Sequence, residues 1–332
     1  AAQTTTMAYT STTNNPTSYS IDWTGMADQA NTPFAFVPGA GTITNIAIPA
    51  GVAAGTYNGT MTIMNGNGCT GTKTVRVVIN PVPTLTGATT SAVCSGNPAV
   101  ISMTGLRPNT TSTVSYTIDG VAQAPVAGVV SNAAGAASFN TPVLNYAAHN
   151  GKTLQITGIT ITSASPNCSA VFTRNVTLVV RPLPTLSGAT QSPVCSGSAA
   201  TINLTGLLVS STFTISYSID GTAQTPVSGV NSNAAGAASF NTPILNYATH
   251  NGKTLQITGI TVTSASPNCT VAFAQNVVLN VEPTLNPGVV GSDQSKCSPA
   301  DPDPFTVITP ASGGLAPLTY QWKSSLTTGG PY

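Results

Sequence analysis

Apolar and polar residues alternate along short stretches of this chain, which is the pattern of half-buried β-strands. In residues 176–181 the apolar set is Val176, Leu178 and Val180. Residues 277–282 repeat the alternation, and only the positions between the apolar residues change in chemical type. We expect the apolar sets to face a core and the alternate positions to face solvent.

Such stretches recur about every ten residues, separated by Gly, Asn and Pro, and no segment shows a capped helical period. This spacing is typical of β-sandwiches. The sequence therefore predicts an all-β fold of tandem sandwich domains arranged as a rod.

A tandem duplication organises the centre of the chain. Residues 81–181 and 182–282 align without a gap at an offset of 101, and about 70 of the 101 positions are identical. We expect one complete domain in each segment, and we call these segments the second and third repeats.

The flanking segments match the same unit. Tyr19-Ser-Ile-Asp22 corresponds to the Tyr-x-Ile-Asp strand of both complete copies, so residues 1–80 read as a first repeat that lacks its N-terminal part. Residues 283–332 read as the N-terminal part of a fourth repeat.

Composition narrows the function classes. Charged residues make up 5% of the chain, against about 25% in ordinary globular domains, while 41% is apolar. The net charge of +1 shows no excess of positive charge of the kind that binds nucleic acid or an acidic membrane surface. The apolar run at 47–54 is too short and too broken by Pro and Gly to span a bilayer. The first residues are polar and Thr-rich, without the basic and apolar regions of a signal peptide, so we expect any such peptide to lie upstream or to have been removed.

The cysteine spacing predicts a disulfide inside each complete repeat. Both repeats place two cysteines 74 residues apart, which favours the pairs Cys94–Cys168 and Cys195–Cys269. A metal site is the competing interpretation, but no CxxC pair or Cys/His cluster supports it. Structural disulfides imply export to an oxidising compartment. Cys69 and Cys297 have no partner in this scheme, and we expect their partners to lie beyond the two ends of the sequence.

Candidates for catalysis are few. Asp119 and Asp220 each precede Gly, which predicts hairpin turns better than acid/base chemistry. His149 and His250 precede Asn-Gly turns and have no carboxylate or cysteine nearby in sequence, so we expect solvated turn residues and no metal, cofactor or catalytic site.

Four further features have a simple structural interpretation beside a functional one. The Asp301-Pro-Asp-Pro304 segment with Asp293 could offer oxygens to calcium, but it departs from an EF-hand loop. Ser95 and Ser196 in Cys-Ser-Gly lack the surrounding nucleophile elbow. The tryptophans, Trp23 and Trp322, could stack on a glycan but occupy a position that is usually core. The loop that differs most between the two complete repeats, Arg107–Thr110 and Leu208–Ser211, could hold binding variation or simple sequence drift.

The ordered motifs resemble a known group. These are Cys-Ser-Gly near the start of each unit, the segment 55–69, the Asn80-Pro-x-Pro-Thr joint and Tyr320-Gln-Trp322. Together they resemble the immunoglobulin-like or PKD-like repeats of giant Bacteroidota surface adhesins, and are similar to those of the flavobacterial gliding-motility adhesin. The resemblance implies type IX secretion and display as a filament at the cell surface.

The sequence therefore favours a structural or adhesive segment of an extracellular surface filament, and not an enzyme. Its expected partners are other repeats of the same chain and possible surface ligands such as extracellular polysaccharide. The alternatives are non-catalytic spacers or carbohydrate-binding modules of a secreted multi-domain hydrolase.

Overall fold

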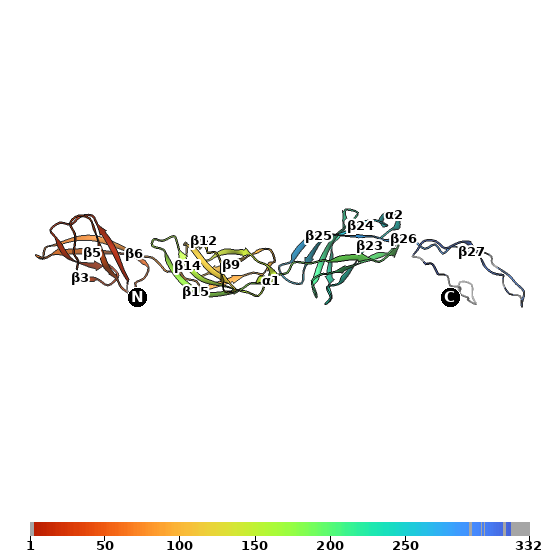
Figure 1. The fold of residues 1–332 in the computed structure, drawn as a ribbon, viewed down its shortest axis with the longest axis horizontal. Helices are drawn as coiled ribbons and strands as arrows, with labels where there is room; N and C mark the ends of the chain where they lie inside the picture. The colour runs from red at the N-terminus through yellow and green to blue at the C-terminus, as the bar shows by residue number, and fades with distance from the viewer. Residues whose placement is uncertain (1–2, 292–293, 300, 302, 315–316, 320–332) are drawn as a thin grey trace. The chain divides into compact units, whose positions relative to one another are not determined.

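Almost all of the regular secondary structure in the described residues is β-strand. The computed structural model describes residues 3–291, 294–299, 301, 303–314 and 317–319. Strands make up 55% of it and helices 3%, which confirms the all-β prediction (Figure 1). Two compact units divide the chain, the first formed by residues 1–91, 98–142 and 151–178, and the second by residues 92–97, 143–150 and 179–332.

The first repeat forms two sheets around one small core. β1 (Gln3–Tyr9) pairs with β4 (Gly41–Ile48), and four other strands form a sheet of order β3-β2-β5-β6. These four are β2 (Pro16–Trp23), β3 (Gln29–Pro33), β5 (Gly55–Asn65) and β6 (Thr70–Ile79). Tyr19 and Ile21 of β2 pack in one cluster with Ile43 and Ile46 of β4, so the core lies between the two sheets.

The second repeat contains a sandwich with an immunoglobulin-like strand order. One sheet has the order β13-β9-β7, and the other has β11-β10-β14-β15 with β12 also on β10. If β7, β9 and β13 are strands A, B and E, the second sheet supplies C′, C, F and G. The strands are β7 (Gly87–Thr90), β9 (Pro98–Thr104), β10 (Thr111–Ile118), β11 (Val121–Ala122), β12 (Val126–Val130), β13 (Ala137–Val143), β14 (Thr153–Ile161) and β15 (Cys168–Thr177).

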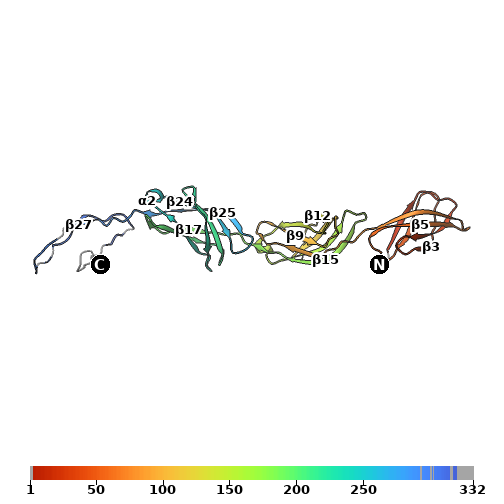
Figure 2. The same cartoon turned by 180° about the vertical axis from the view of Figure 1, so that it is seen from behind.

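The third repeat reproduces this order strand for strand. Three of its strands, β17, β24 and β25, are labelled in Figure 2, which views the chain from behind. Its sheets are β17-β19-β23 and β21-β20-β24-β25, with β22 on β20. Tyr217 of β20 and Phe240 of β23 meet across the core at 5.1 Å between ring centroids. The strands are β17 (Gly188–Gln191), β19 (Ala199–Thr205), β20 (Thr212–Ile219), β21 (Thr222–Ala223), β22 (Val227–Asn231), β23 (Ala238–Ile244), β24 (Thr254–Val262) and β25 (Cys269–Val278).

The alternation read from the sequence sorts the two faces of these strands as expected. Val176, Leu178 and Val180 are buried, whereas Thr177 is exposed. The regular strand nevertheless ends at Thr177, because the Leu178 N–H donates to the Lys152 carbonyl at 2.8 Å outside the ladder. The apolar positions are therefore core, although one continuous strand does not carry them all.

Short elements complete each repeat. β8 (Val93–Cys94) pairs in parallel with β16 (Val180–Arg181), and β18 (Val194–Cys195) pairs in the same way with β26 (Val281–Glu282). The helices α1 (Tyr146–His149) and α2 (Tyr247–His250) are single turns. Beyond residue 283 the described strands are β27 (Val289–Gly291) and β28 (Thr306–Thr309), which pair with each other.

Candidate functional site

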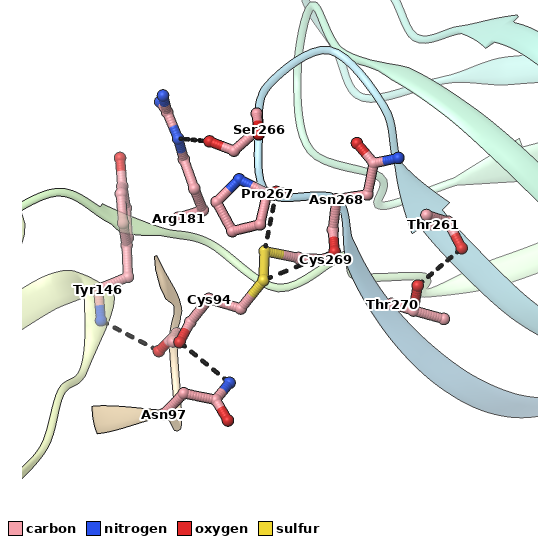
Figure 3. The surroundings of a disulfide bond; sticks show 11 residues. Cys94, Asn97, Tyr146, Arg181, Thr261, Ser266, Pro267, Asn268, Cys269 and Thr270 are labelled. Atoms are coloured by element: carbon pink, nitrogen blue, oxygen red, sulfur yellow. Dashed lines mark hydrogen bonds between the residues drawn. A yellow bond between two sulfur atoms is a disulfide. The ribbon is translucent and has the colours of Figure 1, made fainter. Parts of the chain in front are cut away.

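A disulfide bond joins the second repeat to the third. Cys94 and Cys269 are bonded at 1.97 Å between sulfurs, and their Cα atoms are 5.7 Å apart (Figure 3). That Cα separation lies in the normal range for a disulfide. The predicted pairs Cys94–Cys168 and Cys195–Cys269 are therefore wrong, because Cys168 and Cys195 are free thiols in the described structure.

The length of the last long strand explains the correction. In the third repeat Cys269 begins β25, while Cys195 lies beside Glu282, four residues past the end of that strand. A ten-residue strand spans about 30 Å, whereas bonded cysteines need Cα atoms roughly 4.4 to 6.8 Å apart. The two cysteines of one repeat thus lie near opposite ends of its sandwich.

Backbone hydrogen bonds hold Cys94 in place at the end of the second repeat. Its strand β8 lies beside β16, and the Ser95 N–H donates to the Arg181 carbonyl at 2.8 Å. The Ser95 hydroxyl accepts from the Tyr146 N–H at 3.0 Å, and the Gly96 N–H donates to the Leu144 carbonyl at 2.8 Å. Ser95 thus caps the first turn of α1, as a turn residue beside a disulfide, and its oxygen is not presented as a nucleophile.

Cys269 is the first residue of β25 and directly follows the loop of residues 266–268. Its sulfur is 3.6 Å from the Pro267 carbonyl oxygen, and the Cys94 sulfur is 3.8 Å from that of Asn268 (Figure 3). Arg181 donates from Nε to the Ser266 carbonyl at 3.4 Å. Cys269 is only 1% exposed, so the bond is shielded from solvent on that side. A covalent bond and a charge-assisted hydrogen bond together hold this joint.

The joint between the first and second repeats has a similar polar contact without the covalent bond. Asn80, the counterpart of Arg181 at the 101-residue offset, donates from Nδ2 to the Pro166 carbonyl at 3.1 Å. The Cys168 sulfur is 3.8 Å from the carbonyl oxygens of both Asn80 and Pro166. Cys168 stays half-buried and free. The polar contact is therefore common to both joints, and the disulfide is found at one.

The remaining cysteines are free thiols in the part of the chain that the structure describes. Cys195 is half-buried and is held like Cys94, since the Ser196 N–H donates to the Glu282 carbonyl at 2.8 Å. Cys69 and Cys297 are exposed. That their partners lie outside this sequence stays a prediction.

Asp119 and Asp220 form hairpin turns, as predicted. Both have positive φ, 51° and 48°, in the turns that link β10 to β11 and β20 to β21. Each carboxylate pairs with an exposed lysine, Lys152 at 2.7 Å and Lys253 at 2.8 Å, and is itself more than half exposed. An exposed, paired carboxylate in a tight turn is poorly placed for acid/base catalysis.

His149 and His250 also have structural contacts. The Asn145 N–H donates to Nδ1 of His149 at 2.8 Å, and the Asn246 N–H donates to Nδ1 of His250 at 2.8 Å. Each histidine thus closes the single-turn helix that it ends. Within the described residues no group of three His, Cys, Asp or Glu side chains could hold a metal ion.

The acidic segment near residue 301 contains an ion pair. Asp303 lies 2.6 Å from Nζ of Lys296, and the Asp303 N–H donates to the Gln294 side chain at 2.6 Å. Asp301 is exposed, and Asp293 lies outside the described residues. The carboxylate of Asp303 is therefore already paired with a lysine.

Trp23 is a core residue, 4% exposed, as its position in the Tyr-x-Ile-Asp strand predicts. Its indole Nε1 is buried and has no hydrogen-bond partner among the described residues. Trp322 lies outside the described residues. Trp23 is therefore too buried to stack on a glycan.

The most divergent loop keeps one backbone geometry in both repeats. The Ser131 hydroxyl donates to the Arg107 carbonyl at 2.5 Å, and the Ser232 hydroxyl donates to the Leu208 carbonyl at 2.5 Å. The same hydrogen bond thus holds the loop in both repeats, although the loop side chains differ. Arg107 also donates from Nε to the Val82 carbonyl at 3.1 Å, which gives that arginine a structural contact.

Comparison with known proteins finds no matching family model and no matching curated protein. Solved structures do match. A structure described as "Structural insight into host cell surface retention of a 1.5-MDa bacterial ice-binding adhesin" is 17% identical, covering 84% of this chain and 90% of that chain, with a TM-score of 0.31. One described as "Ca2+-stabilized adhesin helps an Antarctic bacterium reach out and bind ice" is 15% identical over 86% and 71%, with a TM-score of 0.38.

A third similar structure is the "I-band fragment I67-I69 from titin", which is 15% identical over 84% of this chain and 93% of that chain, with a TM-score of 0.35. All three TM-scores are below 0.5. We therefore assign the immunoglobulin-like class from the strand order of the two central repeats.

Proposed function

We propose that this chain is a structural and adhesive repeat segment of a long extracellular filament or surface adhesin. The observation that carries the proposal is the bond between Cys94 and Cys269, because it links consecutive repeats. A disulfide that merely stabilised one small domain would lie inside that domain. A bond between repeats instead holds consecutive domains together, which a stalk under tension requires.

We further propose that the domains follow the sequence repeats, with boundaries near residues 81, 182 and 283. The contacts of Asn80 and Arg181 support this division. Each residue precedes the Pro-containing joint and bonds to the Ser-Pro-Asn-Cys loop of the following repeat. The partners of each domain are thus its neighbours in the array, and Pro-rich joints of this kind act as semi-rigid spacers.

A second role, contact with extracellular polysaccharide, is supported by the outer face of the larger sheets. Gln155 on β14 donates to Asn175 on β15 at 2.9 Å, and Gln256 donates to Asn276 at 2.9 Å in the third repeat. Hydroxyl pairs continue this face, as between Thr261 and Thr270 at 2.8 Å. Uncharged hydroxyls and amides match the hydrogen-bonding groups of a neutral glycan. Repetition of the face would combine weak contacts into useful avidity.

The location that we propose is the cell exterior. Structural disulfides form and persist in oxidising compartments, and the bonded Cys94–Cys269 pair fits such a place. No helix in the described residues is long and apolar enough to cross a membrane. Export by type IX secretion, a Bacteroidota source and a role in gliding are expectations that rest on the resemblance of the sequence motifs.

The experiment is immunogold electron microscopy of intact source cells with an antibody raised against the whole chain. We expect label on fibres well away from the outer membrane. Label found only in the culture medium would overturn the filament proposal and favour the spacer or carbohydrate-binding modules of a secreted hydrolase. A deletion strain provides the control for antibody specificity.

A further inference from the structure

The disulfide closes a very large loop. Cys94 and Cys269 are 175 residues apart in sequence, so the bond encloses most of the second repeat and most of the third. Only residues 81–93 and 270–282 of the two repeats lie outside this loop. The bond thus leaves only a short segment at each end of the two repeats outside the loop.

Tension on a filament passes along the chain from one end to the other. When a repeat without a cross-link unfolds, all of its backbone is released, at up to about 3.6 Å per residue. In this chain the force would enter at residue 81, reach Cys94, and cross directly to Cys269. Residues 95–268 would carry no extending force once the flanking segments are stretched.

We infer that the Cys94–Cys269 bond makes the two central repeats a nearly inextensible tether, which limits how far the filament lengthens when these domains unfold under load. The inference rests on the proposed role as a stalk under tension. The length of chain enclosed by the bond sets the size of the effect, since 175 residues correspond to about 600 Å of extended chain. The bond would keep that length out of reach of the force.

The position of the bond matters for this effect. Cys94 follows the first strand of the second repeat, and Cys269 begins the last long strand of the third. Bonds inside each repeat, Cys94 to Cys168 and Cys195 to Cys269, would leave residues 169–194 free to extend between them. The bond between repeats includes this stretch and the Pro182 joint inside the protected loop.

Shielding of the bond suits a permanent link. Cys269 is 1% exposed, and the loop carbonyls of Pro267 and Asn268 lie against the two sulfurs. Attack on a disulfide requires access of a thiolate to a sulfur atom. The folded joint therefore protects the disulfide from reduction. The intact disulfide then limits the extension of the chain if the domains unfold.

The test is single-molecule stretching of the full chain, held through peptide tags at its two ends, with and without reductant. We expect the fully extended oxidised chain to be shorter by about 600 Å than the same chain after reduction. C94S and C269S should each show the longer extension without reductant. C195S is the matched control, because Cys195 is held on the same kind of two-residue strand but is free, and it should keep the short extension.

The readout is the length of the stretched chain, so it does not depend on whether a variant folds as stably as the parent. Equal extended lengths for the oxidised parent and C94S would overturn the inference. A shortening lost in C195S but kept in C94S would also overturn it. Failure here would leave the cellular location open, because immunogold labelling tests the filament independently of its extensibility.

Discussion

Arg181, the last residue of the second repeat, donates from Nε to the carbonyl oxygen of Ser266 in the third repeat at 3.4 Å. The same loop leads directly into Cys269, the first residue of β25, which is bonded to Cys94. The residue that ends one repeat and the cysteine near its beginning therefore meet the same loop of the next repeat. This convergence is possible because β8, which carries Cys94, runs beside β16, which ends in Arg181.

Peptide mapping without reduction should recover Cys94 linked to Cys269. We expect the other four cysteines to react with a thiol reagent after denaturation, and the intact chain to be lighter than its reduced form by the two hydrogens of one disulfide. Recovery of Cys94 linked to Cys168 would contradict the structure and restore the arrangement predicted from sequence spacing.

Replacement of Cys94 should destabilise the central repeats. Closing a loop of 175 residues restricts the unfolded chain, and C94S should lower the free energy of unfolding by about 3 to 5 kcal/mol. Guanidinium denaturation followed by circular dichroism measures this change. C195S serves as the control and should have a much smaller effect, because Cys195 is free. Equal losses in both variants would assign the effect to local packing of the cysteine side chain.

Asp119 should matter for its backbone conformation more than for its charge. Its φ is 51°, a region that Asn and Asp enter more readily than Ala, while its carboxylate is an exposed partner of Lys152. We expect D119N to change the free energy of unfolding by less than about 0.5 kcal/mol, as for an exposed ion pair. D119A should cost about 1 to 2 kcal/mol, because Ala is strained in this region.

The same denaturation measurements decide between the two roles of Asp119. K152A removes the ion pair without touching the turn and should resemble D119N. A large loss in K152A together with a small one in D119A would show that the ion pair is the main contribution.

Stability should fall at alkaline pH because of the core tyrosines. Burial raises the pKa of Tyr116 and of Tyr217 above the ordinary value of 10.0. The native state therefore holds the phenol protons more tightly than the unfolded state does. Their contribution is fully present below pH 10 and is lost as the pH rises through the higher folded pKa.

Urea denaturation at a series of pH values from about 8 to 11 measures this dependence. The double variant Y116F/Y217F has no phenol protons at these positions, so its stability should decline less steeply. Parallel decline of the parent and the variant would show that these two tyrosines do not govern the alkaline behaviour.

Local patterns in the sequence were sufficient for the class of fold and for the turn residues. The alternation of Val176 and Leu178 with Thr177 predicted which side chains face the core, because successive strand residues point to opposite faces. Asp119 before Gly predicted a turn, because few residue types accept positive φ. The histidine contacts were missed, since nothing in the local sequence shows that Nδ1 of His149 accepts from the Asn145 N–H.

The sequence by itself thus determined the repeat, its strand faces, its turns and the presence of cysteines at fixed positions, because each of these depends on residues close together in the chain. Only the tertiary structure decided which cysteines are bonded. A spacing of 74 residues in the sequence does not give the distance between two cysteines in space. A ten-residue strand such as β25 separates the two ends of a repeat by about 30 Å. Cys94 therefore reaches Cys269 of the next repeat, because the backbone brings β8 and the start of β25 together at the joint.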